Sequence, residues 1–309
     1  MKGEAVLYSI AGAGLTLFCF VSAQWLGPVG AFTNMLAAVP VAYLVMRFGL
    51  AYGLFAVLLS AVSLWQLAGN AVLMSYLGLY LVPSLLLPWL LRGGQVWDRA
   101  LLISGMVTLG VAAALLFGYL QYSGLEPGAL IDRYLQSEVD MAMQVYREAN
   151  LGETELAELK QVAAGVAEFI RKTFVGLYAA GVMVIHLISL LLLQRFRKND
   201  YEIEGVGFPR WRLPAMLIWL LILAGFALLA PLEILSLVGR NLLAVLLPLY
   251  FLQGLAVVSS FLQRKSWSPA MKGLIYVLVF VLNPLPLVVT GVGIFDLWVD
   301  FRRPRKKDL

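Results

Sequence analysis

Long apolar runs, each close to twenty residues in length, follow one another along most of this chain. Of its 309 residues, 61% are hydrophobic and 13% are charged, whereas a water-soluble domain normally carries about 25% charged residues. The chain therefore cannot cover a water-facing surface, and lipid must be its solvent. The expected fold class is all-α, a polytopic bundle of transmembrane helices.

The apolar runs predict about eight spans, because a transmembrane helix needs about 20 apolar residues. Five runs precede a polar interruption and three follow it, before a last apolar stretch. The expected spans are 4–26, 28–46, 49–69, 70–91, 99–122, 172–194, 213–234 and 241–263, and the last stretch covers 273–299. The first run faintly resembles a cleavable signal peptide, but its length and the span that follows at once favour a first transmembrane helix.

Lysine and arginine are distributed unevenly over the loops, and this predicts the orientation of the chain. If the N-terminus is cytoplasmic, seventeen of the 23 basic residues face the cytoplasm, including those of the C-terminal tail. The positive-inside rule then places both the N-terminus and the C-terminus in the cytoplasm. We expect a multi-pass membrane protein with both termini on the cytoplasmic side.

The last apolar stretch, 273–299, conflicts with this orientation, because a ninth full span would place the basic tail outside. Asn283-Pro284-Leu285-Pro286 lies near its middle, and proline breaks helical hydrogen bonding. The stretch is either a broken, re-entrant C-terminal hairpin or a kinked ninth span. The charge rule favours the broken hairpin.

The polar interruption holds half of the acidic residues of the chain. These nine are Glu126, Asp132, Glu138, Asp140, Glu148, Glu153, Glu155, Glu158 and Glu168. Apolar residues recur at helical spacing on both sides of a break at Asn150-Leu151-Gly152. This predicts an extracytoplasmic hairpin of two amphipathic helices, whose apolar faces either meet each other or lie on the outer membrane surface. The second helix could run unbroken into the span near Lys172. The hairpin is either a lid or partner surface, or a solvated connection with no further role.

Polar side chains within the spans are candidates for a binding site, because burying them in lipid is costly. Six fall in the outer half of the membrane under the expected topology and could line one outward-facing cup for a small, largely apolar ligand. These six are Gln24, Asn34, Gln66, Asn70, Glu233 and Asn241, and three deeper candidates are His186, Gln253 and Asn283. The alternative is hydrogen bonding between helices, and for the single histidine a neutral, packed side chain.

Small residues form a candidate partner-helix face on the first span. Ala5, Ser9 and Ala13 repeat every fourth residue, and the same spacing recurs at Gly49–Gly53 and Gly176–Ala180. Such faces let helices approach closely. The contact is either within the chain or with a partner subunit.

Catalytic and metal-binding signatures are missing from the sequence. There is no Walker A loop and no HExxH or GxSxG motif, and a single histidine and cysteine exclude a His/Cys zinc site. The basic residues lie at the ends of apolar runs, unlike a nucleic-acid-binding patch. Asp296 and Asp300 suit a charge anchor at the membrane boundary; the alternative, a catalytic carboxylate pair, lacks an acid–base partner. We expect no enzyme, no cofactor, no metal and no nucleic-acid partner.

Two passages in the last third of the chain carry a family resemblance. They are Leu246-Leu247-Pro248-Leu249-Tyr250-Phe251-Leu252-Gln253-Gly254-Leu255-Ala256-Val257-Val258 and Gly293-Ile294-Phe295-Asp296-Leu297-Trp298-Val299-Asp300-Phe301-Arg302. They resemble the YybS-like family of bacterial integral membrane proteins, and the length and span layout match over nearly the whole chain. The resemblance implies a bacterial cytoplasmic-membrane protein of unassigned function.

The N-terminal spans more distantly resemble the substrate-binding subunits of energy-coupling-factor vitamin transporters. In those subunits a small-residue face on the first helix meets the transmembrane coupling subunit, and Ala5, Ser9 and Ala13 match it in style. The additional C-terminal spans and the long insertion of this chain depart from that pattern.

The sequence thus predicts a membrane protein that binds or takes up a small molecule together with a separate energising membrane subunit. Its expected parts are a five-span bundle (1–122), the extracytoplasmic hairpin (123–171) and a C-terminal bundle with a basic tail (172–309). The alternative is a non-transporting scaffold whose acidic hairpin binds other proteins. A continuous pocket of about a few hundred Å³ in the cup would favour binding, and close-packed helices there would favour a scaffold.

Overall fold

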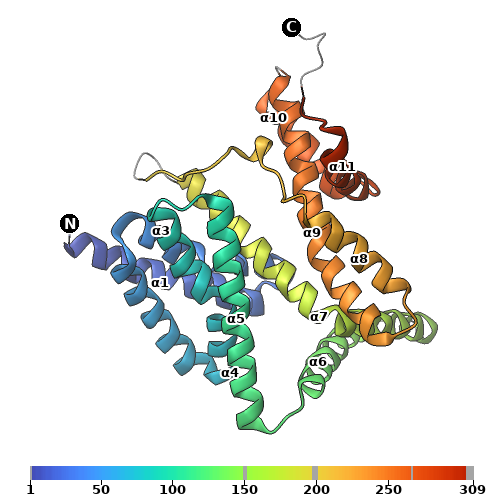
Figure 1. Ribbon diagram of the computed structural model, residues 1–309. Coiled ribbons are helices and arrows are strands. Elements are labelled where there is room, and N and C mark those ends of the chain that lie inside the picture. The colour runs from blue at the N-terminus through green and yellow to red at the C-terminus, as the bar shows by residue number, and fades with distance from the viewer. Residues whose placement is uncertain (1, 149–151, 197–200, 266, 304–309) are drawn as a thin grey trace. The chain divides into compact units, whose positions relative to one another are not determined.

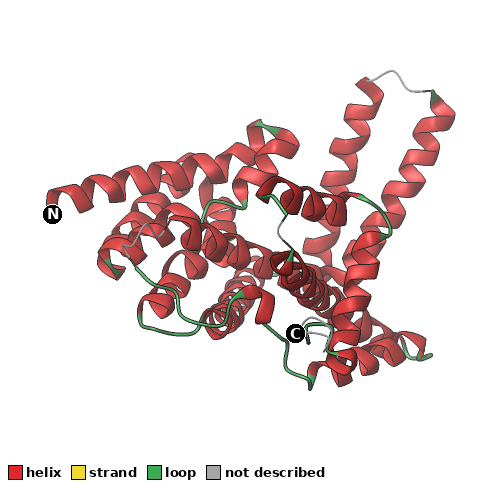
Figure 2. Cartoon of the chain, turned by 90° about the horizontal axis from the view of Figure 1, so that it is seen from above, coloured by secondary structure: helices red, strands yellow, loops and turns green. Residues whose placement is uncertain are grey.

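The computed structural model describes residues 2–148, 152–196, 201–265 and 267–303. Within these residues every regular element is a helix (Figure 2), which confirms the expected all-α class. The elements labelled in Figure 1 are α1 (Lys2–Trp25), α2 (Gly27–Asn34), α3 (Val39–Phe48), α4 (Leu50–Arg92), α5 (Trp97–Ser123), α6 (Pro127–Glu148), α7 (Glu153–Phe196), α8 (Leu217–Leu229), α9 (Glu233–Arg264), α10 (Pro269–Val281) and α11 (Leu285–Val299), with a short 3₁₀ helix, η1 (Phe208–Arg210), before α8.

The chain forms two compact units. Unit 1 comprises Met1–Leu130 and Gly181–Gly205, and unit 2 comprises Ile131–Ala180 and Val206–Leu309. Two of the boundaries therefore fall inside helices α6 and α7. The three topological segments expected from the sequence have other bounds and stay a prediction.

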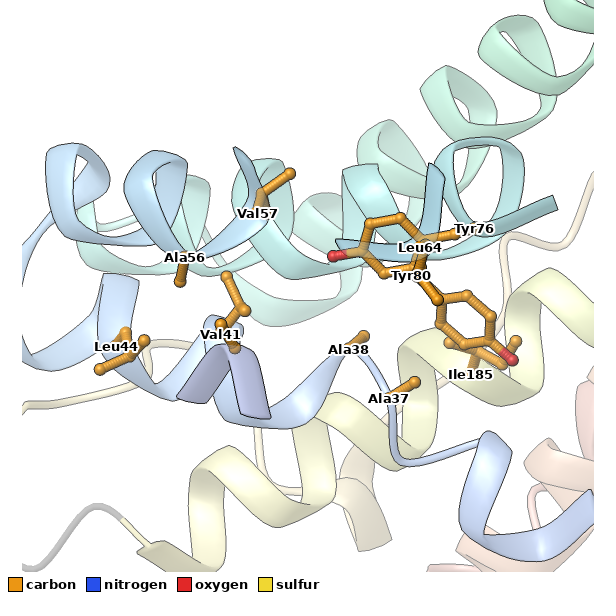
Figure 3. Packing of buried hydrophobic residues seen from close by; sticks show 11 residues of the cluster. Ala37, Ala38, Val41, Leu44, Ala56, Val57, Leu64, Tyr76, Tyr80 and Ile185 are labelled. Atoms are coloured by element: carbon orange, nitrogen blue, oxygen red, sulfur yellow. The ribbon is translucent and has the colours of Figure 1, made fainter. Parts of the chain in front are cut away.

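The core of unit 1 is built from α1, the α2–α3 turn, α3, α4 and the C-terminal part of α7 (Figure 3). Its fully or almost fully buried members are Ala13, Ala37, Ala38, Val41, Leu44, Ala56, Val57, Leu64, Tyr76, Tyr80 and Ile185. Alanines in this set allow close helix approach, and Gly12 extends the same effect, since a Cβ there would lie 2.6 Å from Leu44 Cδ1. Phe20 packs edge-on against Tyr76 and Tyr80, with ring centroids 5.7 and 5.6 Å away. Edge-to-face aromatic pairs stabilise a fold by more than the apolar area that they bury.

Helix α4 is bent at Gly69, where the backbone has φ 82° and ψ −175°. This conformation is accessible to glycine because it has no Cβ, so Gly69 divides α4 into two arms. Each arm is close to the length of one span. The two arms match the spans expected at 49–69 and 70–91.

Six helical segments among the described residues are long and apolar enough to cross a membrane, one of which, Val29–Phe48, comprises α2 and α3; the bent pair α10–α11 makes a seventh if it is one span. The count rises when α4 is divided at Gly69 and when the shorter apolar helix α8 is added. Each predicted apolar segment then has a helical counterpart. The polytopic helical architecture is confirmed.

Helix α8 corrects one expected boundary. A full span was expected over 213–234, but α8 covers only Leu217–Leu229, which is about 20 Å of helix against a hydrocarbon core of about 30 Å. Pro214 and Pro231 flank it, and proline lacks the N–H that a helix interior requires. The helix is therefore shorter than its apolar sequence.

The last apolar stretch is broken, as expected, and α10 and α11 meet at a bend of 101°. Pro284 and Pro286 lie at the start of α11, where the absent N–H groups cost no helical hydrogen bond. In the polar interruption, α6 and α7 are both helices, and α7 continues without a break from Glu153 to Phe196. The second helix of the polar interruption therefore continues into the span that begins near Lys172, as the sequence allowed.

Candidate functional site

An apolar groove of about 340 Å³ lies between the two arms of α4 in unit 1. Its lining residues are Leu54, Val57, Leu58, Ala61, Val62 and Trp65 from the first arm and Leu73, Leu77, Leu81 and Leu85 from the second. The second-arm leucines recur every fourth residue, so they share one helix face. The groove thus follows from the bend at Gly69, which brings two apolar faces of one helix together.

The groove is open along one side. Val57 is buried, but Leu58 is 62% exposed and Trp65 is 55% exposed. In a membrane, exposed apolar side chains of a span face lipid. A molecule dissolved in the bilayer could therefore enter sideways without crossing a polar barrier.

One end of the groove carries polar groups. Trp65 Nε1 donates a hydrogen bond to Asn70 Oδ1, 2.8 Å away, across the bend. Gln66, next to Trp65, is exposed, and so is Asn70. These two predicted cup residues therefore flank the bend at the end of the groove, although neither lines it.

Asn34 is engaged inside unit 1. Its Nδ2 donates to Phe20 O at 2.9 Å, and Tyr80 Oη donates to its Oδ1. Gln24 belongs to α1, but its side chain lies outside the described part of the structure. The structure thus shows an interhelical role for Asn34, and a ligand role stays a prediction.

The other two cup candidates, Glu233 and Asn241, belong to unit 2. Glu233 is exposed in the first turn of α9. Asn241 Oδ1 accepts from Gly176 N at 2.8 Å, and its Nδ2 donates to Lys172 O at 2.8 Å. Asn241 therefore joins α9 to α7. The six cup residues are divided between the two units, and their shared role as a cup stays a prediction.

His186 is buried in unit 1. Its Nδ1 lies 2.8 Å from Val182 O, and its Nε2 lies 3.4 Å from Thr108 Oγ1. A carbonyl oxygen only accepts, so Nδ1 carries the proton. This is the arrangement of a packed histidine.

Asn283, another deep candidate, is exposed at the break between α10 and α11.

The small-residue face of α1 is covered by the chain itself. Ala5, Ser9 and Ala13 are 2%, 0% and 1% exposed, and Ser9 Oγ donates to Ala5 O at 2.9 Å and to Tyr52 O of α4 at 3.3 Å. Internal packing thus accounts for this face. Gly53 repeats the pattern, because a Cβ there would lie 2.2 Å from Val45 Cγ2.

The two passages that carry the family resemblance cross each other in unit 2. A Cβ on Gly254 of α9 would lie 1.9 Å from Val289 O, and one on Gly293 of α11 would lie 2.0 Å from Tyr250 O. Gln253 lies at the same crossing: its Nε2 donates to Gly293 O at 3.0 Å, and its Oε1 accepts from Leu213 N at 2.9 Å. Gln253, one of the deeper candidates, therefore connects α9 to α11 and to Leu213, which precedes α8.

Asp296 and Arg302 form a buried ion pair beside this crossing. Arg302 Nη2 lies 2.9 Å from Asp296 Oδ2, with side-chain exposures of 7% and 0%. Arg302 Nη1 also donates to Pro209 O at 3.1 Å and to Trp211 O at 2.6 Å. The pair fastens the η1 loop to the end of α11. The sequence placed Asp296 in a boundary anchor, but it did not predict burial.

Asp300 follows α11 and accepts hydrogen bonds from two arginines, Arg212 and Arg303. Burial alone would raise the pKa of Asp300, but the hydrogen bonds and charges of Arg212 and Arg303 outweigh it and lower that pKa below its ordinary value. Both arginines therefore hold Asp300 in its ionised form. This supports an anchoring role for the segment.

The groove between the arms of α4 could not be predicted from the sequence, because its leucines resemble any lipid-facing leucines. The only cue was the boundary between the expected spans 49–69 and 70–91. Among the described residues, no group of three or more His, Cys, Asp or Glu side chains is arranged to hold a metal ion.

Comparison with protein-family models gives a match over residues 14–297 to the family described as "Predicted membrane protein (DUF2232)". No curated protein and no solved structure matches the chain. The family match confirms the expectation of a multi-spanning membrane family whose function is unassigned. The resemblance to transporter subunits finds no support among these comparisons.

Proposed function

The chain belongs to the DUF2232 family of predicted membrane proteins, and from this premise we propose that it binds a small, largely apolar molecule within the membrane. The groove between the arms of α4 is the binding site. The protein then passes its ligand to a separate energising membrane subunit for uptake.

The volume and lining of the groove carry the proposal. About 340 Å³ lies within the range of small-molecule sites, about 300–1,000 Å³, which are mostly apolar with a few polar groups. All ten lining side chains are apolar except for the indole N–H of Trp65, and Asn70 accepts the hydrogen bond of that N–H. The ligand class is thus a hydrocarbon chain or ring, with its polar group at the end near Gln66 and Asn70.

The energising subunit is needed because uptake across the membrane requires a source of energy. The groove explains capture, but no residue of the proposed site supplies energy for movement across the membrane. Uptake would therefore require a second membrane protein. A chain that acts as a scaffold instead would hold only bulk lipid in the groove.

Ligand analysis of purified protein tests the proposal. Ala61→Trp fills the groove from its first arm, whereas Ala114→Trp adds the same side chain at an exposed position of α5. Both variants and the unchanged protein are purified in nanodiscs of one synthetic lipid, and the molecules that remain bound are identified by mass spectrometry. We expect a stoichiometric apolar compound with the unchanged protein and Ala114→Trp, and its loss with Ala61→Trp. The same molecules in all three samples would refute the proposal.

A further inference from the structure

Two exposed apolar stripes lie on the polar helices of unit 2. On α6 the stripe consists of Tyr134, Met141 and Val145, and on α7 of Val162, Val166 and Phe169; these side chains are 52–65% exposed. The spacings place each stripe on one helix face. Large apolar side chains gathered on one face of a polar helix indicate an interaction site.

The stripe on α6 is distinct from the face that packs within the protein. Leu135 and Met143 of α6 are buried, at 8% and 7% exposure, and Val139 between them is half-buried. These residues lie about a quarter turn or more from the stripe of Tyr134, Met141 and Val145. The stripe is therefore an additional apolar face with no cover among the described residues.

Lipid cannot cover the whole stripe of α7. The uncharged part of α7 begins after Lys172, and Val162 precedes Lys172 by ten residues in the same continuous helix. At 1.5 Å per residue, Val162 lies about 15 Å along the helix from that boundary. Glu155, Glu158 and Glu168 share this part of α7 with the stripe. A charged helical extension of this length belongs in water, so its apolar stripe requires a protein cover.

The net negative charge of this region indicates which kind of partner protein it attracts. Residues 126–172 contain nine acidic and five basic residues. Glu138 lies one turn from Tyr134 and Met141, and Glu158 lies one turn from Val162, so acidic side chains border both stripes. A second copy of the chain would bring the same negative charge against this surface, and like charges repel across an interface. A partner with a basic surface would instead be attracted to these acidic residues.

A shallow polar recess on the exposed face of α6, beside its stripe, offers amide, hydroxyl and carboxylate oxygens to a basic side chain. All its lining residues belong to α6, and they include one cation, Arg133, and one carboxylate, Asp140; the others are Gln136, Ser137, Met141 and Gln144. Met141 belongs to both the stripe and the recess. The carboxylate of Asp140, which accepts from Gln136 Nε2 at 3.0 Å, is also available to a lysine or arginine of a partner.

We propose that the α6–α7 stripes bind a helical segment of another protein, which carries apolar side chains at helical spacing with lysines or arginines beside them. The apolar side chains cover the stripes, and the basic side chains pair with the bordering carboxylates and with Asp140. This is the helix-on-surface mode of recognition. The inference does not depend on the groove between the arms of α4.

A designed peptide tests this surface with the full chain in nanodiscs of uncharged phosphatidylcholine. The probe is an 18-residue helical peptide with leucines on one face and lysines beside them, and its matched control has glutamates in place of the lysines. Binding is measured by fluorescence anisotropy, with empty nanodiscs subtracted. We expect the lysine peptide to bind at least about tenfold more tightly than the glutamate peptide, and its affinity to fall with added salt. Equal binding of the two peptides, or no binding, would overturn the proposal.

Matched variants locate the binding. Val166→Glu places a charge within the stripe, and Ala164→Glu places the same charge at an exposed position of α7 outside it. We expect Val166→Glu to weaken binding of the lysine peptide about tenfold or more and Ala164→Glu to change it less than about twofold. Equal effects of the two variants would contradict the assignment. A dimer of the chain that Val166→Glu abolishes would instead identify a second copy as the occupant, and would also overturn the proposal.

Discussion

Asn241 of α9 bonds to the backbone of α7 around Gly176. Its Oδ1 accepts from Gly176 N and its Nδ2 donates to Lys172 O, both at 2.8 Å. The two helices are so close that a Cβ on Gly176 would lie 2.4 Å from the backbone oxygen of Asn241. The small residue and the amide therefore act together, because the amide reaches the α7 backbone only where no side chain separates the helices.

Replacing either partner should loosen this crossing. Asn241→Leu removes two interhelical hydrogen bonds, which should lower the free energy of unfolding by about 1 kcal/mol. Gly176→Ala forces the helices apart and should cost about 1–3 kcal/mol. Unfolding in mixed micelles of mild detergent and dodecyl sulfate, followed by circular dichroism, measures both changes.

Gly165→Ala is the matched control on the same helix, because a Cβ there meets no atom within 4 Å. Alanine is the better helix former, so this variant should be as stable as the unchanged protein or slightly more stable. If Gly165→Ala and Gly176→Ala lost equal stability, close helix contact at Gly176 would not be the cause.

The crossing of α9 and α11 should be still less tolerant. A Cβ on Gly293 would lie 2.0 Å from Tyr250 O, whereas one on Gly291 of the same helix would meet no atom within 4 Å. We therefore expect Gly293→Ala to abolish or sharply reduce the yield of folded protein and Gly291→Ala to leave it unchanged. Size-exclusion chromatography of the two variants in detergent distinguishes them, and a monodisperse Gly293→Ala protein at normal yield would contradict the observed packing.

The anchor at Asp300 predicts a dependence of stability on pH. Burial opposes ionisation, but Arg212 and Arg303 lower the pKa of Asp300 below its ordinary value. A carboxyl with a lowered pKa in the folded state contributes stability above its unfolded pKa and loses that stability as the pH falls through the folded pKa. The contribution should thus be complete at neutral pH and decrease as the pH falls below about 4 towards the lowered pKa of folded Asp300.

Asp300→Asn is the variant that isolates this effect. Thermal unfolding of the unchanged protein and of Asp300→Asn between pH 7 and pH 3 should show a stability difference at neutral pH that shrinks towards acid. A difference that stays constant over this range would show that Asp300 stabilises the protein by some means other than its charge.

Much of the fold could be predicted from the sequence, because lipid imposes simple rules. Apolar runs predicted the helices, the boundary between the expected spans 49–69 and 70–91 predicted the division of α4, and Asn283-Pro284-Leu285-Pro286 predicted the break before α11. Each prediction depended on local chemistry alone. Helix α8 is shorter than its apolar run because flanking prolines, rather than hydropathy, set its ends.

The site was harder to predict because it depends on which faces meet. Asn34, Asn241 and Gln253 were candidates because they are polar residues of the spans, and all three make hydrogen bonds to other parts of the chain. The sequence does not show whether such a polar side chain bonds to a ligand or to the backbone of another helix. The groove-lining residues were not singled out at all, because leucine at helical spacing is equally typical of a lipid-facing surface.

The predicted orientation can be tested with single cysteines. Cys19 is the only cysteine of the chain, so Cys19→Ser provides a background for Ser137→Cys on α6 and Gln95→Cys between α4 and α5. Both positions are exposed. The positive-inside rule predicts that a membrane-impermeant maleimide labels Ser137→Cys in intact cells and labels Gln95→Cys only after permeabilisation. The reverse pattern would invert the predicted topology.

Photolabelling tests the groove between the arms of α4 most directly. The full chain in phosphatidylcholine nanodiscs is irradiated with a diazirine-bearing palmitic acid, and the modified residues are mapped by mass spectrometry. Exposed apolar side chains outside the groove, such as Leu67 at 79% exposure and Met106 at 57%, report labelling by bulk contact. We predict labels concentrated between Leu54 and Leu85 on the groove face, saturating with probe concentration and lost in Ala61→Trp. Labels spread evenly over Leu67, Met106 and the groove, rising without saturation and unchanged in Ala61→Trp, would contradict a binding site there.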